Sequence, residues 1–232
     1  MLEEQIEVMI EDHCNYPNGK LRISGNYLAT SVLIPMWASL FKQKHSEIEV
    51  HISTVNSKEA LENLKNFESD IAIFGSEDVI KKNFDSLDCI ELYRDKFEFV
   101  VATTHKYANQ EIEIAEIMKE PFIMREEGST TRKKLDKLCE IHEVETPKIE
   151  LQFNGLNETI RAVIAGYGVS FVSSLVASQF IKRGELAKVN VRGVNFTNNI
   201  ILCSHKKTYI EEYIQNFILI AVNNKKDILE AP

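Results

Sequence analysis

Apolar residues along the first third of the chain recur with two alternating periods. A period of two, typical of strands, covers residues 20–24, 48–54 and 70–75, whereas a period near 3.6, typical of helices, covers residues 32–45 and 60–67. Strands and helices that alternate in this way favour a parallel sheet with helices on both of its faces. The first third of the chain is therefore predicted to be a β-α-β-α-β unit.

The same alternation returns after a long apolar strand pattern at residues 97–104. Strand patterns then occupy 121–125, 148–153 and 169–174, helix patterns occupy 111–118, 132–144, 159–166 and 175–184, and two late strands precede a final helix at 209–224. No linker rich in Pro or Gly separates the two blocks, since their boundary near Thr103–Thr104 falls at the end of a strand. We therefore predict an α/β protein of two subdomains joined by extended hinge strands.

Residues 2–13 have a pattern of their own, a short acidic amphipathic helix that ends at turn residues 15–19. A helix this short is marginal alone in water. We expect it to pack on another part of the protein or to be the end of a longer helix. Its acidic start is unlike a secretory signal, which has a basic start and an apolar centre.

Composition and charge narrow the class of protein. The 232 residues are 44% apolar and 27% charged, which is typical of globular domains, and the net charge is −8. Nucleic-acid binding needs a concentrated basic face, whereas the lysine pairs of this chain are scattered, so the chain by itself is a poor candidate for it. No apolar stretch approaches the roughly 18 residues of a membrane span, so no membrane partner is expected.

The four cysteines are far apart in the sequence and show no metal-binding spacing; they are Cys14, Cys89, Cys139 and Cys203. Reduced thiols are the usual state of cysteine in the cytoplasm. We therefore expect four reduced thiols in a cytoplasmic protein.

Small polar residues follow four of the predicted strands, at Ser24–Tyr27, Asn56–Ser57, Gly128–Thr131 and Asn154–Gly155. Ligands of open parallel sheets bind beyond the carboxyl ends of the strands, where helix N-termini present unpaired N–H groups and a partial positive charge. Such a place suits a carboxylate or another small anion. The alternative at each junction is plain N-capping, because these residue types are also the best helix caps.

No pattern of catalytic residues accompanies these junctions. The six histidines lack metal-ligand spacing, and the chain has neither a nucleophile elbow nor a phosphate-binding loop. Gly166-Tyr167-Gly168 is only a fragment of a dinucleotide fingerprint, and it follows a helix, so we interpret it as a helix stop. The sequence therefore predicts no catalytic residue, no metal and no cofactor.

Several segments together resemble one family. The stretches "GKLRIS…LIPMWASLFKQKHSEIEVHI…NSKEALENLKNFESDIAIFG", "PFIMREEGSTTRKKLD" and "RAVIAGYGVSFVSSLV…IKRGELAKVNVRG" resemble the effector-binding domain of LysR-type transcriptional regulators, in the order and spacing of that family. The resemblance runs from Gly19 to about residue 220. No single segment is specific to this family, but the set of segments is.

The resemblance implies a periplasmic-binding-protein-like (type 2) fold of two Rossmann-like subdomains. Residues 1–18 would be a remnant of the family's linker helix, residues 19–103 and 201–232 subdomain I, and residues 104–200 subdomain II. A small anionic effector would bind in the cleft between the subdomains. The ligand-binding residues carried over from the family are Asn26, Tyr27, Asn56, Ser57, Gly128, Ser129, Thr130, Thr131 and Asn154.

The sequence also departs from the family. Ser or Thr is usual at the first junction, so the larger Tyr27 is expected to narrow the pocket or to stack on the effector. Asn198-Asn199 replaces a basic residue that is common near the last strands. Lys133 and Lys134 are expected to face solvent, whereas Arg132 either reaches the cleft or ties its subdomain together.

The function implied is an effector-sensing regulatory domain that is not an enzyme. Its partners would be a small carboxylate or oxyanion, a second copy in a homodimer, a tetramer in the full-length protein, and DNA only through a winged helix-turn-helix domain missing from this sequence, which we expect to be a truncated form. The alternatives are a solute-binding receptor of the same fold for a small anion, and an enzyme on this fold.

Overall fold

A computed structural model describes residues 19–75, 86–206 and 211–225. The helix expected over residues 2–13 lies outside the described residues. The chain divides into two compact units, of which unit 1 comprises Met1–Tyr93 and Asn199–Ala231, and unit 2 comprises Arg94–Asn198. Each unit is described below by itself.

Among the described residues, the sheet of unit 1 has the strand order β2-β1-β3-β10-β4. Strands β1 (Lys20–Gly25), β2 (Glu49–Thr54) and β3 (Ile71–Gly75) are parallel, as the sequence predicts. Strand β10 (Thr197–His205) is antiparallel to β3, and β4 (Leu87–Ala102) lies beyond it. Strand β10 therefore makes the sheet mixed rather than wholly parallel.

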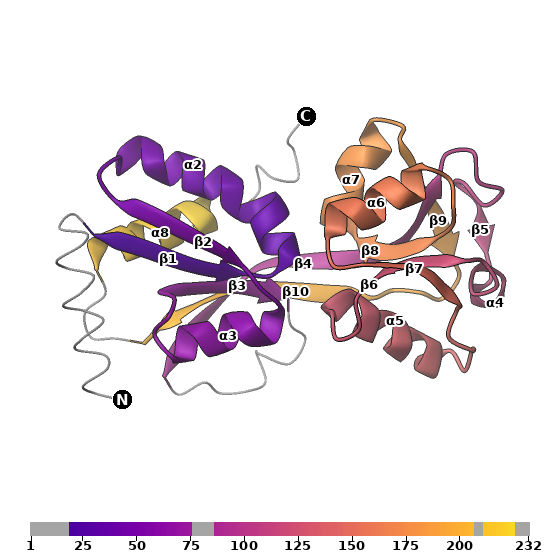
Figure 1. Cartoon of the computed structure of the whole chain (residues 1–232), viewed down its shortest axis with the longest axis horizontal. Coiled ribbons are helices and arrows are strands. Elements are labelled where there is room, and N and C mark those ends of the chain that lie inside the picture. Colours follow the sequence, from indigo (N-terminus) through magenta and orange to yellow (C-terminus); the bar gives the residue numbers. More distant parts are fainter. Residues whose placement is uncertain (1–18, 76–85, 207–210, 226–232) are drawn as a thin grey trace. The chain divides into compact units, whose positions relative to one another are not determined.

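Helices cover both faces of this sheet. Helices α2 (Ile34–Lys44) and α8 (Glu212–Asn223) pack together on one face, and α3 (Ser57–Lys65) covers the other (Figure 1). The rings of Phe41 and Phe217 meet edge to face between α2 and α8, at a centroid distance of 5.7 Å. Unit 1 thus has apolar cores on both sides of its sheet.

Helical structure begins earlier in unit 1 than the sequence indicates. The predicted helix begins at residue 32, yet helical turns start at Tyr27 and continue through a π-helical segment, η1 (Ala29–Leu33), into α2. The N–H of Ile34 bonds to the carbonyl of Ala29, five residues back. Since Pro35 has no N–H and its ring would clash with the carbonyl four residues back, the widened turn lets the helix pass this proline.

Unit 2 begins in the second half of β4. Strand β8 (Ser170–Ser173) pairs antiparallel with β4, as does β9 (Leu186–Val191), and the short β5 (Glu111–Ile112) is parallel to β9. Residues 111–118, predicted to be one helix, are instead β5 and the short α4 (Ile114–Ile117). The alternation of "EIEI" fits a strand as well as a helix, and pairing with β9 decides between them.

Two further strands of unit 2 carry the βα junctions of interest. Strands β6 (Phe122–Arg125) and β7 (Ile149–Phe153) are parallel, with α5 (Thr130–Ile141) on one side and α6 (Leu156–Ile164) on the other (Figure 1). Helix α7 (Ser174–Lys182) follows β8 directly. The predicted strand-to-helix order of this block is therefore confirmed.

The core of unit 2 is rich in aromatic rings. Phe171 is fully buried, and its ring lies 4.7 Å from that of Phe99, 5.2 Å from that of Phe97 and 6.5 Å from that of Phe196, between centroids. Aromatic pairs at these separations add to the free energy of burial. Phe171 is therefore the centre of this core.

Two predicted elements of unit 1 have different limits in the structure. Strand β4 begins at Leu87 rather than at residue 97, because its first half pairs with β10 within unit 1. Phe67, expected inside a helix, follows α3 with a positive φ of 63°, and its ring stacks on that of His205 at 4.0 Å. The stacking contact accompanies a backbone conformation that such a residue rarely adopts.

The expectation of four reduced cysteines is wrong. Cys89 of β4 and Cys203 of β10 form a disulfide, with their Cα atoms 4.2 Å apart. They lie on neighbouring antiparallel strands, where facing residues come this close, and a sequence separation of 114 residues conceals that proximity. Cys139 is a free, buried thiol, and Cys14 lies outside the described residues.

Two kinds of feature, a membrane-spanning helix and a metal-ligand cluster, are absent from the described residues. Within residues 19–75, 86–206 and 211–225, no helix is both long enough and apolar enough to cross a membrane. The same residues contain no group of three or more His, Cys, Asp or Glu side chains that could hold a metal ion.

Candidate functional site

The parallel strands of unit 1 bring the first two predicted junctions together. Gly25, at the end of β1, is in register with Thr54 of β2 and with Ile73 of β3. The N–H of Val55 donates to the carbonyl of Gly25 at 3.0 Å, and the N–H of Asn26 donates to that of Ile73 at 3.1 Å. The carboxyl ends of three strands therefore converge at Asn26.

Asn26 links the helix that follows β1 to the helix that follows β2. Its Oδ1 accepts from the N–H of Ala29 at 3.0 Å, and its Nδ2 donates to Oγ of Ser57 at 3.4 Å. Ser57 is the first residue of α3. Two residues predicted from different junctions are thus in contact within unit 1.

Two threonines complete this polar group, although neither is among the predicted site residues. Oγ1 of Thr54 donates to Oγ1 of Thr30 at 3.0 Å, and Oγ1 of Thr30 donates to the carbonyl of Asn26 at 3.2 Å. The sequence pattern predicts a strand at Thr54 and leaves Thr30 between the first junction and the first helix. The signal that points to them is the parallel register, which places the end of β2 beside the start of the first helix.

The other two predicted residues of unit 1 have different surroundings. Asn56 is exposed and caps α3, since its Oδ1 accepts from the N–H groups of Lys58 and Glu59, both at 3.0 Å. This is the N-cap interpretation that the sequence left open. Tyr27 is half-buried in the first helical turn.

The junction between β6 and α5 is a tight turn into a capped helix. Gly128 has a φ of +86°, a conformation that suits glycine, and a Cβ there would meet no atom of the described residues within 4 Å. Ser129 is the N-cap of α5, with Oγ accepting from the N–H of Arg132 at 3.2 Å. Thr130 and Thr131, which open the helix, are half-buried.

A buried arginine at the end of β6 is not among the site residues predicted from the sequence. Arg125 is 5% exposed, and its guanidinium donates to both carboxylate oxygens of Glu126, at 2.7 and 2.8 Å. The pair stands at the same strand end as Ser129. An arginine that ends an otherwise apolar strand is the signal that identifies it.

Strand pairing brings the third and fourth junctions to one edge of unit 2. Arg125 is in register with Phe153, and the N–H of Glu126 donates to the carbonyl of Phe153 at 3.1 Å. Asn154 follows as an exposed residue in a bend, and Gly155 is the N-cap of α6. The predicted residues Ser129 and Asn154 therefore belong to the same strand edge.

The basic residues after Ser129 differ from expectation in one case. Lys133 is exposed as predicted, but Lys134 is buried, at 6% exposure. Its Nζ donates to the carbonyl of Thr197 at 2.9 Å and lies 5.5 Å from the centre of the Phe97 ring. Helical spacing places Lys134 on the inner face of α5, where its long stem is buried while its charged end finds an acceptor.

Arg132 forms an ion pair within its own helix. Nε of Arg132 lies 3.5 Å from Oδ1 of Asp136, one turn further along α5. This is an ordinary i,i+4 ion pair, which contributes little to stability.

Asp95 is a buried carboxylate at the N-terminus of α7. It is 3% exposed, and its Oδ1 accepts from Oγ of Ser174 at 2.8 Å and from the N–H of Leu175 at 3.3 Å. Its Oδ2 has no partner among the described residues. Burial raises the pKa of this carboxyl, and the hydrogen bonds from the start of α7 only partly oppose that rise.

We expect the Asp95→Asn variant to be more stable than the parent at neutral pH. A raised carboxyl pKa means that the folded protein holds this proton more tightly than the unfolded chain does. The contribution of Asp95 to stability therefore falls as pH rises from below the usual carboxyl pKa through the raised pKa. Asparagine keeps the Oδ1 acceptor and has no charge to bury. Urea unfolding of both proteins across this pH range measures the difference.

Asp88→Asn is the matched control for this prediction, because Asp88 is an exposed carboxylate of the same strand. Its effect on the unfolding midpoint should be small at every pH. An Asp95→Asn variant that is less stable at neutral pH and more stable in acid than the parent would contradict the prediction.

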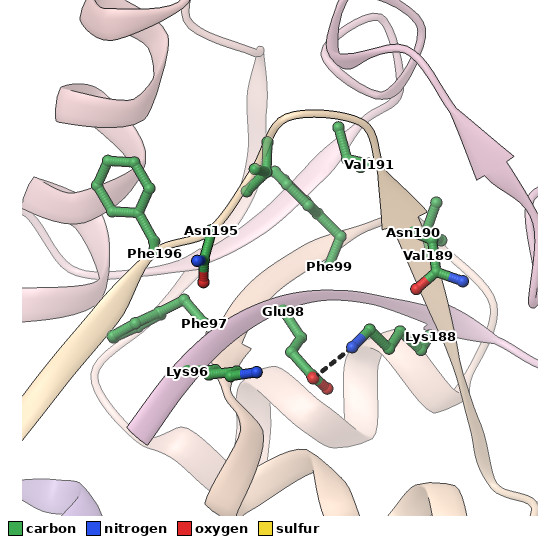
Figure 2. Close-up of a pocket in the computed structure, with 11 residues that line it drawn as sticks. Lys96, Phe97, Glu98, Phe99, Lys188, Val189, Asn190, Val191, Asn195 and Phe196 are labelled. Atoms are coloured by element: carbon green, nitrogen blue, oxygen red, sulfur yellow. Dashed lines mark hydrogen bonds and ion pairs between the residues drawn. The ribbon is translucent and has the colours of Figure 1, made fainter. Parts of the chain in front are cut away.

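A pocket of about 160 Å³ lies in another part of unit 2, where the loop after β9 passes β4 (Figure 2). Its lining includes the ion pair of Lys188 with Glu98, and Phe196 from the loop side. None of the nine predicted site residues lines this pocket. It is therefore a feature separate from the strand-end junctions.

Comparison with known proteins gives one family. A family model described as the LysR substrate binding domain matches residues 15–224. A protein of Trichormus variabilis named a probable RuBisCO transcriptional regulator is 26% identical over 211 residues, covering 90% of this chain and 62% of the relative. One of the same name from Phaeodactylum tricornutum is 25% identical over 226 residues, covering 92% and 73%.

Solved structures give the same fold. The regulatory domain of CcmR from Synechocystis PCC6803, in complex with 2-PG, superposes with a TM-score of 0.77 at 22% identity, covering 90% of this chain and 98% of that one. The effector binding domain of QuiR, in complex with shikimate, gives a TM-score of 0.71 at 20% identity, with the same coverages. These likenesses confirm the expected periplasmic-binding-protein-like α/β fold.

The chain spans 62% of the length of the Trichormus variabilis relative.

Proposed function

The chain belongs to the LysR substrate-binding domain family, and we propose that it is the effector-sensing regulatory domain of a LysR-type transcriptional regulator. The observation that carries this proposal is the gathering of small polar side chains at helix N-termini beyond parallel strands, in unit 1 around Asn26 and Ser57 and in unit 2 around Ser129. Such places bind small ligands in open α/β sheets.

We propose that the effector is a small carboxylate or oxyanion. The start of α5 offers backbone N–H groups, the hydroxyls of Thr130 and Thr131, and the partial positive charge of a helix N-terminus. Arg125 adds a cation at the same strand end, held in place by Glu126. The 2-PG bound by CcmR and the shikimate bound by QuiR make these two compounds the first candidates to test.

Both units are proposed to contact the effector. The contributing residues are the predicted Asn26, Tyr27, Asn56, Ser57, Gly128, Ser129, Thr130, Thr131 and Asn154, together with Thr30, Thr54 and Arg125 from the structure. Asn56 and Ser129 would do so while they cap α3 and α5, because a capping side chain oxygen leaves the remaining N–H groups of the helix end open.

The rest of the proposed function concerns the whole regulator. We propose that it is a cytoplasmic protein that works as a homodimer, and as a tetramer at full length, binds DNA through a winged helix-turn-helix domain, and has no enzymatic activity. Strand β2 supports the dimer, because it lies at the edge of its sheet with most side chains exposed, including Ile52 at 42%. An exposed edge strand is a ready surface for pairing.

We expect a saturating effector to raise the melting temperature of the purified chain. Ligand at 100 times its dissociation constant adds about 2.7 kcal/mol to stability, which corresponds to roughly 5–10 °C for a protein of this size. A thermal-shift panel of small carboxylates and oxyanions, with 2-PG and shikimate included, measures this rise. A panel without any shift would contradict the proposal.

The Ser129→Asp variant tests the location sharply. Aspartate caps a helix as well as serine does and suits the helix dipole, so α5 should keep its stability. Its charge should repel an anionic effector and abolish the thermal shift. Ser39→Ala, on the exposed face of α2, should leave the shift unchanged. A shift that survives Ser129→Asp would place the anion elsewhere.

The solute-binding receptor stays as the second candidate, because it shares the fold and the anion-binding helix ends. The two differ in assembly, since a receptor of this kind would be a monomer. Mass measurement by light scattering distinguishes them, and a stable dimer disfavours the receptor. Steady turnover of any effector candidate would instead indicate an enzyme.

A further inference from the structure

The cysteine pair of unit 1 is not used by the proposed effector site. Cys89 and Cys203 lie on the adjacent strands β4 and β10, with their Cα atoms 4.2 Å apart. This is close to the separation of facing residues in antiparallel strands, about 4.5 Å. Strand pairing therefore keeps the two sulfurs in reach of each other, so that forming or breaking the bond requires no rearrangement of the sheet.

The two cysteines differ in their access to solvent. Cys203 is fully buried in the apolar cluster between α3 and the sheet, with Leu64, Phe74 and Leu87, whereas Cys89 is exposed. Cys89 is therefore the cysteine of the pair that a small reagent can approach from solvent. Exposed disulfides are the labile ones, and structural disulfides are typically inert to the glutathione pool.

We propose that Cys89 and Cys203 form a reversible thiol–disulfide site that responds to low-molecular-weight disulfides. This rests on the proposed function in one respect, namely the reducing cytoplasm in which such a regulator works, where disulfides are transient and redox-sensing rather than structural. It assigns a modification site distinct from the strand-end residues of the effector site.

The exchange is a balanced two-electron reaction. The Cys89 thiol loses its proton, and its sulfur attacks one sulfur of oxidised glutathione, breaking that S–S bond and releasing one glutathione thiolate. Deprotonated Cys203 then attacks the Cys89 sulfur of the mixed disulfide and releases the second glutathione. The two cysteine thiols are oxidised, oxidised glutathione is reduced to two thiols, and the two protons lost are taken up by the glutathione thiolates.

The bond would act on the two strands that connect the units of the chain. Strand β4 passes from unit 1 to unit 2 after Tyr93, and β10 returns to unit 1 at Asn199. A link between Cys89 and Cys203 fixes the register of these strands just before and just after the crossings. The whole of unit 2 then lies inside one covalent loop.

The test uses the 232-residue chain with Cys14→Ser, so that the cysteine outside the described residues cannot be the partner. The folded, reduced protein is exposed to oxidised glutathione, and free thiols are then alkylated and mapped by peptide mass spectrometry. We expect Cys89 and Cys203 to be lost together as one linked peptide pair. Millimolar reduced glutathione should restore both thiols.

Cys139 is the internal control in every sample. It is buried, and burial raises the pKa of its thiol to about 11, so it should stay reduced and react only after unfolding. The linked form should melt about 5–10 °C above the reduced form. Cys89→Ser, a change at an exposed position, should abolish that difference, whereas Cys139→Ala should keep it.

Two results would overturn the proposal. One is a Cys89–Cys203 pair that stays reduced in the presence of oxidised glutathione, and the other is a link that survives millimolar reduced glutathione. Neither measurement involves an effector or DNA, so a failure of the effector proposal would leave the thiol counts unchanged. Conversely, an inert cysteine pair would leave the thermal-shift panel unaffected.

Discussion

The Phe171→Ala variant is expected to lose about 3–5 kcal/mol of the free energy of unfolding of unit 2, the range for removing a fully buried aromatic ring. Phe171 has no solvent exposure, and its ring contacts those of Phe97, Phe99 and Phe196. Alanine leaves a cavity at the centre of that core. Urea unfolding followed by circular dichroism measures the loss.

The single tryptophan of the chain shows where the loss occurs. Trp37 is fully buried in unit 1, so its fluorescence reports on that unit. Phe171→Ala should shift the circular dichroism transition more than the fluorescence transition. Phe217→Ala, the matched change in the core of unit 1, should shift the fluorescence transition strongly. A loss below about 1 kcal/mol for Phe171→Ala would contradict its central place.

Gly168→Ala is expected to destabilise unit 2 by about 3 kcal/mol through overpacking. A Cβ at Gly168 would lie 2.2 Å from the carbonyl oxygen of Pro121. That oxygen accepts from the N–H of Val169 at 2.9 Å, so the backbone on both sides would have to separate. The melting temperature of the variant and the protection of the Val169 amide from hydrogen exchange measure the effect.

Gly166 gives a matched comparison two residues earlier. It has a φ of +88°, and a Cβ there would meet no atom from the part of the chain that the structure describes within 4 Å, so its need for glycine is conformational. Asparagine tolerates positive φ, and Gly166→Asn should therefore cost little. Gly168→Asn should be at least as damaging as Gly168→Ala. If the two asparagine variants lost the same free energy of unfolding, the close approach of Gly168 to Pro121 would be unimportant.

Much of the fold could be predicted from periodicity. The three parallel strands of unit 1 and the β6-α5-β7-α6 order of unit 2 lie where the apolar pattern indicates. Helices with one buried face and buried strands such as β3 produce that pattern, whereas β2 follows it although most of its side chains are exposed. The interpretation of Gly166-Tyr167-Gly168 as a helix stop is also confirmed, since α6 ends at Ile164 and Gly166 has a positive φ.

The remaining features depend on contacts between distant segments. Lys134 is buried because its charged end reaches the carbonyl of Thr197, an acceptor 63 residues further along the chain. Cys89 and Cys203 meet only because β4 and β10 are neighbours. The hydrophobic pattern is local, so it predicts neither of these two contacts.

Only part of the candidate site was predictable, because local residue types are visible in the sequence and contacts set by strand register are not. The residue types at strand ends identified Asn26, Ser57 and Ser129, and the structure shows the contact of Asn26 with Ser57. Thr54 and Arg125 were missed because they belong to strands, where their neighbours are set by register. The cleft between the subdomains stays a prediction of the sequence.

The place of β10 within the sheet of unit 1 determines the order in which the two units can be completed during synthesis. Residues 94–198 are contiguous, so all of unit 2 leaves the ribosome as one piece. In contrast, β10 lies between β3 and β4, and the sheet of unit 1 has a gap until residue 205 has been made. During synthesis, unit 2 can therefore fold while the sheet of unit 1 still lacks β10. The strand edges that β10 will later cover need protection until then.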